Sequence, residues 1–201
     1  LNNVVLTNGS EVAAGDFGKL VFKPTLDFNG AVTFKYKGSD GYIFTKNETS
    51  VNITVNAVND APKVSSNETL LAINEDIATG DNIGQTIASL ITDGSITDVD
   101  GNVVKAIAIT SVNNSYGTWQ YKLASGSWAN ISNTTGENIN LNTSALLLNS
   151  DSLVRFIPNA NFNGTSTFEF RAWDKSTGVV GGTTNPFILG GNTSVSSEIK
   201  T

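Results

Sequence analysis

The sequence contains no cysteine, no methionine and no histidine. Without cysteine the chain has neither a disulfide framework nor a thiolate zinc site. Without histidine it lacks the commonest general base and the commonest transition-metal ligand, which excludes Ser-His-Asp and Cys-His catalysis. We therefore expect a protein that is not an enzyme. The lack of cysteine does not fix the compartment, but it suits a protein that works outside the cell.

Basic residues are also scarce, with 12 Lys plus Arg against 18 Asp plus Glu and a net charge of −6. Nucleic-acid binding depends on clustered cations, so we expect no nucleic-acid partner. The carboxylates suit either solubility or the binding of a hard cation such as calcium. No run approaches the ~20 apolar residues of a membrane-spanning helix, so direct membrane insertion is not expected. Hydrophobic residues make up 39% of the chain, which is enough to form a core.

One segment of the sequence occurs twice. Residues 22–40 read FKPTLDFNGAVTFKYKGSD, and residues 156–174 read FIPNANFNGTSTFEFRAWD. The two align without a gap, and the identical pairs are Phe22 and Phe156, Pro24 and Pro158, Phe28 and Phe162, Asn29 and Asn163, Gly30 and Gly164, Thr33 and Thr167, Phe34 and Phe168, and Asp40 and Asp174. An internal repeat is the signature of an array of similar domains.

The hydrophobic pattern predicts an all-β fold. Apolar and polar residues alternate over residues 32–36, 51–55 and 107–110, as they do in half-buried antiparallel strands. Asn-Gly and Asp-Gly pairs recur along the chain and favour tight turns. No window carries a capped helical stripe, and residues 143–148 are expected to form one helical turn at most. Many short strands with regular turns indicate a β-sandwich.

A domain boundary is predicted after residues 51–55, where the sequence reads NAVNDAPK. Pro62 cannot donate a ladder hydrogen bond and biases the preceding residue toward extended geometry, so a stiff linker is expected, with a new strand near Lys63. Residues 1–61 and 62–201 are therefore assigned to two domains. The repeated segment begins early in the first domain but late in the second. We expect the first domain to be truncated at its N-terminus, in a chain that is a piece of a longer protein.

On these motifs the chain resembles the cadherin-like tandem repeats of large bacterial surface proteins and calcium-dependent adhesins. The resemblance is carried by PTLDFNG and PNANFNG, by the YKGSDG and FRAWD stretches, and by the VNDAP linker that follows ITV. It implies two tandem cadherin-like, Ig-like, Greek-key β-sandwich domains with calcium at the domain junctions. It also implies an extracellular or cell-surface location, and as partners the neighbouring repeats of the same chain, other copies, or a cell-surface glycan or protein.

Oxygen-bearing residues near the predicted junction are the candidate Ca²⁺ ligands. They are Asn59 and Asp60 in the linker, Asp98, Asp100 and Asn102 in the TDVDGN turn, and Asp174 at the end of FRAWD. Calcium takes six to eight oxygens from carboxylates, amides, backbone carbonyls and water. The resemblance implies that the linker acid, the two turn acids and the strand-end acid gather at the joint. The competing interpretation is that they are ordinary turn residues.

Three further acids are weaker metal candidates. Asp40 is the repeat counterpart of Asp174, and Glu75 and Asp76 in INED match the acid that cadherins place after their first strand. The resemblance assigns these acids to neighbouring joints, so here we expect them to be unpaired surface acids. The TDVDGN turn itself is not an EF-hand, because the acid expected at its twelfth position would fall on Ile109.

The leading hypothesis is a non-enzymatic, calcium-stabilised structural repeat of an extended extracellular adhesin or surface filament. The alternative is a glycan- or protein-binding β-sandwich module, in which Trp119 and Trp128, on a predicted hairpin, stack on a ligand. Core packing is the competing explanation for these aromatic residues. Asn-x-Ser/Thr sequons lie at Asn8, Asn47, Asn52, Asn67, Asn113, Asn130, Asn133, Asn142, Asn163 and Asn192. In a host that glycosylates asparagine, the exposed sequons would carry glycans.

Overall fold

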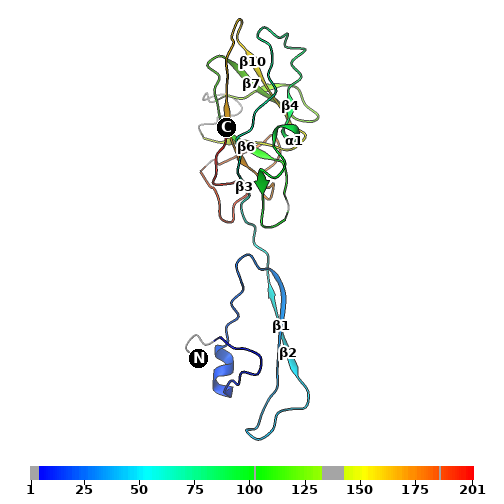
Figure 1. Ribbon diagram of the computed structural model, residues 1–201, viewed down its shortest axis with the longest axis vertical. Coiled ribbons are helices and arrows are strands. Elements are labelled where there is room, and N and C mark those ends of the chain that lie inside the picture. The colour runs from blue at the N-terminus through cyan, green and yellow to red at the C-terminus, as the bar shows by residue number, and fades with distance from the viewer. Residues whose placement is uncertain (1–4, 102, 133–142, 186) are drawn as a thin grey trace. The chain divides into compact units, whose positions relative to one another are not determined.

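The computed structural model describes residues 5–101, 103–132, 143–185 and 187–201. Over these residues the chain consists mainly of antiparallel β-sheets, as the sequence predicted (Figure 1). It divides into unit 1, Leu1–Ala57, and unit 2, Val58–Thr201. This boundary lies slightly before the predicted one, because the linker residues are bonded to unit 2. The Ala61 N–H, for example, donates to the Gly191 carbonyl at 2.6 Å.

Unit 1 contains a 3₁₀ helix, η1 (Ala14–Lys19), and a two-stranded sheet of β1 (Gly30–Tyr36) and β2 (Thr49–Val55). The strands are antiparallel, with Phe34 opposite Val51. Both were predicted from their alternating residues. The apolar residues of each strand lie on one face of the sheet, because successive side chains point to opposite faces. None of the residues that the structure describes in unit 1 is buried.

Over its described residues, unit 2 is built from two four-stranded antiparallel sheets and a two-stranded one. Its strands are β3 (Lys63–Val64), β4 (Gln85–Thr86), β5 (Ile96–Thr97), β6 (Ile107–Val112), β7 (Gly117–Lys122), β8 (Ala129–Asn130), β9 (Ala145–Leu148), β10 (Leu153–Pro158), β11 (Phe168–Ala172) and β12 (Thr183–Thr184). The strand orders are β4-β10-β7-β8, β11-β6-β9-β12 and β3-β5. The predicted hairpin is present as β7 and β8, and α1 (Ile87–Leu90) is a single turn capped by the Thr86 hydroxyl.

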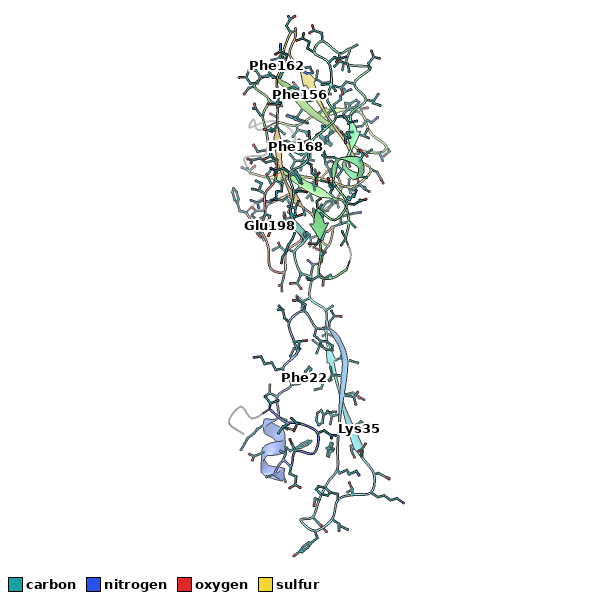
Figure 2. All side chains as sticks on the ribbon, in the orientation of Figure 1. Phe22, Lys35, Phe156, Phe162, Phe168 and Glu198 are labelled. Atoms are coloured by element: carbon teal, nitrogen blue, oxygen red, sulfur yellow. The ribbon has the colours of Figure 1, made fainter. Side chains whose placement is uncertain are left out.

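The main core of unit 2 joins the two four-stranded sheets. The Trp119 ring on β7 lies edge-on to Phe168 of β11, with ring centres 5.0 Å apart, and 5.3 Å from Phe156 of β10. These residues belong to one cluster with the inward-facing residues of β6 and β9. The two sheets thus pack face to face through these aromatic rings (Phe156 and Phe168 are labelled in Figure 2) and the aliphatic side chains around them.

The strand over residues 107–110 is buried on both faces, and the prediction that it would be half-buried was wrong. Ile107 and Ile109 belong to the main cluster, whereas Ala108 belongs to a second cluster with Leu147 and Trp173. The second cluster covers the outer face of the β11-β6-β9-β12 sheet. Alternating hydrophobicity is weakened there because alanine is enough to fill the outer positions.

Residues 145–148 form β9 rather than the helical turn considered for residues 143–148. All four residues are buried, two in each cluster. A short, continuously apolar run cannot be assigned to helix or strand from periodicity alone. None of the helices in the described part of the chain has the length and apolar character needed to cross a membrane.

The last residues of unit 2 run alongside β11. Isolated bridges join Trp173 to Val195 and Phe170 to Lys200, and Phe170 and Lys200 exchange both backbone hydrogen bonds. In unit 1, β2 lies in the same way beside β1, which is the repeat counterpart of residues 164–170. The repeat in the sequence therefore corresponds to a repeated pairing of strands.

Candidate metal site

Three aspartates of unit 2 are joined to one another by hydrogen bonds, and a fourth, Asp174, is bonded to the neighbouring Asn59. The Asp60 N–H in the linker donates to Asp100 Oδ2 at 2.8 Å, and the Asp100 N–H donates to Asp98 Oδ1 at 2.9 Å. The Asn59 side-chain nitrogen donates to Asp174 Oδ2 at 2.9 Å. All five side chains are half-buried. The structure thus brings together five of the six residues in the main candidate set, and the sixth, Asn102, lies outside the described residues.

The pairing of β3 with β5 explains why the linker and the turn meet. β3 begins directly after the buried Pro62, and Lys63 lies opposite Thr97, the last residue of β5. The chain therefore enters β3 beside the point where it leaves β5 for the aspartate turn. Gly101 closes that turn with φ of +77°, a conformation that glycine adopts without steric cost.

Asp174 reaches the same place because it follows β11, which lies beside β3. The preceding Trp173 is buried in the second cluster, and its indole N–H donates to the Thr177 carbonyl at 2.8 Å. The Asp174 backbone N–H bonds the Ser194 carbonyl, and its Oδ1 accepts from the Ser176 N–H at 2.7 Å. The buried Trp173 before it and the hydrogen bonds to Ser194 and Ser176 therefore hold Asp174 in place.

The four carboxylates repel one another. The pKa of Asp98 is raised, first because partial burial disfavours its charged form and then because of the negative charges of Asp100, Asp174 and Asp60. The hydrogen bond from the Asp100 N–H opposes this shift without cancelling it. Clustering of like charges costs stability, and a cation bound among these carboxylates would relieve the repulsion.

The donor chemistry of the cluster fits calcium. Besides the carboxylates, the carbonyl oxygens of Asp60 and Thr193 both lie 3.1 Å from the Asn59 side-chain nitrogen. Oxygen ligands of this mixed kind are those that calcium prefers. In the arrangement seen over the described residues, no group of three or more acidic side chains is close enough together to hold a metal ion. The carboxylates would have to move toward one another on binding.

The Thr193 carbonyl is a donor that the sequence analysis missed. A backbone carbonyl is present at every residue, so it leaves no signal in the sequence. It is brought to the cluster by the loop that connects β12 to the final pairing segment, where the Thr193 N–H bonds the Gly190 carbonyl.

Asp40, Glu75 and Asp76, the three weaker metal candidates, each lie in a separate environment. Asp40 Oδ1 accepts from the N–H groups of Ile43 and Tyr42, and these bonds, with Ile43 first, lower its pKa. Asp76 Oδ1 accepts from the Asn161 N–H at 2.9 Å. Both were expected to be unpaired, but Asp40 caps its own turn and Asp76 bonds a turn far away along the chain. Glu75 is exposed, as expected of a surface acid.

The two tryptophans proposed for glycan stacking differ in accessibility. Trp119 is 3% exposed, and its indole N–H donates to Ser166 Oγ at 2.9 Å, so it packs in the core. Trp128 is half-buried, with the Arg155 guanidinium 3.9 Å and the Lys122 ammonium 5.5 Å from its ring centre. A glycan-binding surface would therefore depend on Trp128, whose ring already stacks on a cation.

Comparisons of the chain with protein-family models, with curated proteins and with solved structures found no match. The resemblance to cadherin-like repeats consequently depends on the sequence motifs and on the geometry of this cluster. The fold by itself identifies the chain as an all-β protein with a sandwich-like second unit. It does not specify a function.

Proposed function

We propose that the chain is a non-enzymatic structural repeat of an extended extracellular or cell-surface protein, with cadherin-like domains stabilised by calcium. The observation that carries this proposal is the convergence of Asp60, Asp98, Asp100 and Asp174 from three segments of unit 2. Asn59 and the carbonyls of Asp60 and Thr193 would complete the oxygen donors.

Calcium would supply the positive charge that the cluster lacks. Asp60 lies only a few residues after the boundary between the units, so a cation held there would tie the linker to the aspartate turn and to the end of β11. Without the cation, repulsion among the carboxylates favours their separation. A repeat stiffened in this way acts as a spacer or adhesive element, and its role would be mechanical rather than catalytic.

Thermal melting with calcium and with chelator tests the proposal. A ligand that binds only the folded state adds about 2.7 kcal/mol at a hundredfold excess over its dissociation constant. Magnesium should stabilise less, because it requires a tight octahedral shell and gives up water reluctantly. Asp60→Asn should remove most of the calcium effect. Asp151→Asn, which changes an exposed acid outside the cluster, should keep it. Equal melting temperatures in calcium and chelator would refute the proposal.

A further inference from the structure

The side-chain nitrogen of Asn59 lies among three oxygens of the aspartate cluster. It donates to Asp174 Oδ2 at 2.9 Å and to the backbone carbonyls of Asp60 and Thr193, each at 3.1 Å. These acceptors come from three parts of unit 2, namely the linker, the residue that follows β11 and the loop that precedes the final pairing segment. A single amide nitrogen therefore ties the three parts together.

The acceptors decide which end of the Asn59 amide faces them. A carboxylate and two carbonyls have no proton to donate, so only the NH₂ group of the amide can bond all three. The NH₂ group has two protons for three acceptors, which means that at least one proton is shared between two oxygens. The bond to Asp174 is the shortest of the three, as expected when the acceptor is a carboxylate.

The contacts of the Asn59 nitrogen resemble those of a cation in kind but not in length. Calcium would bind the same carboxylate and carbonyl oxygens at about 2.3–2.6 Å. The observed distances of 2.9–3.1 Å are those of N–H···O hydrogen bonds. This wider spacing agrees with the finding that, over the described residues, no three acidic side chains lie close enough together to hold a metal ion.

We propose that the Asn59 amide is an internal substitute for the cation. In the metal-free protein its NH₂ group holds the oxygens of the linker, the end of β11 and the Thr193 loop, and it must withdraw before a cation binds among them. A half-turn about the Cβ–Cγ bond exchanges Nδ2 for Oδ1 and would convert Asn59 from a donor into a cation ligand. The exchange of the amide for a cation rests on the proposed function, whereas the metal-free contacts do not.

NMR of the full ¹⁵N-labelled chain, with chelator and with calcium, tests both states of the amide. The side-chain signals of Asn59 are identified by their loss in Asn59→Ala. In chelator these protons should exchange with water at least about tenfold more slowly than those of Asn192, which is exposed. Saturating calcium should shift the Asn59 signals and remove this protection, because the NH₂ group no longer faces its three acceptors.

The stability of the metal-free protein provides a second measurement. In chelator, Asn59→Ala should lower the melting temperature of unit 2 by about 3–6 °C, because three acceptors lose their donor. The matched control is Asn192→Ala, which changes an exposed residue next to Thr193 and should lower the melting temperature by less than about 2 °C.

Asn59→Asp separates the two roles of the side chain. In chelator it should melt below Asn59→Ala, because a carboxylate takes the place of the donor. In titration calorimetry it should bind calcium at least about tenfold more tightly than the wild type, since it adds a charged ligand and no amide has to be displaced. Asn192→Asp adds the same charge at an exposed position and should tighten binding less than about threefold.

Three results would overturn this inference alone. They are exchange of the Asn59 protons in chelator as fast as those of Asn192, protected and unshifted Asn59 signals in a chain that calcium has stabilised, and equal tightening of calcium binding by the two aspartate variants. The absence of any calcium effect on the wild type would instead overturn the proposed function and, with it, the exchange of the amide for a cation.

Discussion

Asp98→Asn should have opposite effects on stability with and without calcium. The substitution removes one negative charge from the cluster, where Asp100, Asp174 and Asp60 raise the pKa of Asp98. The asparagine Oδ1 can still accept the Asp100 N–H, so the turn itself is preserved. In chelator the variant should be more stable than the wild type. In calcium it should be less stable, because one carboxylate ligand is missing.

The two effects differ in size. Without metal, the relief of repulsion at a half-exposed cluster is worth up to about 1 kcal/mol after solvent screening. That amount corresponds to about 3 °C in melting temperature for a unit of this length. With calcium at a hundredfold excess over its dissociation constant, the wild type gains about 2.7 kcal/mol, or ~8 °C, most of which the variant should lose.

The difference in stability between the wild type and Asp98→Asn should depend on pH with a definite sign. A carboxyl whose folded-state pKa is raised binds more protons in the folded state than in the unfolded state, starting near its ordinary value of 3.8. The stability of the wild type relative to Asp98→Asn should therefore fall as pH rises through this range. It should level off above the folded-state pKa of Asp98.

Calorimetry of the wild type and Asp98→Asn, in chelator and in calcium and over a pH series, measures the charge-repulsion effect, the calcium effect and the pH dependence of stability. The reasoning would be refuted if Asp98→Asn lowered stability equally in calcium and in chelator. That result would mean that Asp98 is an ordinary turn residue and that its neighbours exert no electrostatic strain on it.

Three other substitutions test the packing of unit 2 and whether Asp40 belongs to the aspartate cluster. Arg155→Lys should cost about 2–4 kcal/mol in chemical denaturation, because an ammonium cannot make all three bonds that the buried guanidinium donates to Gln120 Oε1 and two backbone carbonyls. A loss below about 0.5 kcal/mol, the usual range of surface substitutions, would contradict this. Trp119→Ala should cost about 3–5 kcal/mol by the same measurement, and an unchanged transition would argue against a shared core. Asp40→Asn should leave the calcium-induced shift of unit 2 unchanged in calorimetry, and loss of that shift would place Asp40 in the same site.

Local pattern was enough to predict β1, β2, the β7–β8 hairpin and the start of β3. Each of these depends on the alternation of neighbouring residues or on a nearby turn, which a sequence displays directly. The same reasoning was wrong for the exposure of residues 107–110, and it gave residues 143–148 one helical turn at most where residues 145–148 form β9. Both segments lie in a sheet covered on its two faces, where a strand can be apolar on both sides, so alternation is a poor guide to its exposure and a continuous apolar run is a poor guide to its type.

The sequence by itself determined the all-β class, the internal repeat and the absence of histidine- or cysteine-based catalysis, because composition and short-range periodicity are properties of the chain alone. Only the tertiary structure decided which acids meet and which aromatics are reachable. Asp60, Asp98 and Asp174 come together because β3 pairs with β5 and lies beside β11. Trp119 is buried because it packs on Phe168 of the second sheet, whereas Phe34, the repeat counterpart of Phe168 in unit 1, is 37% exposed. Such contacts join segments far apart in the sequence, and strand pairing sets them rather than any local preference.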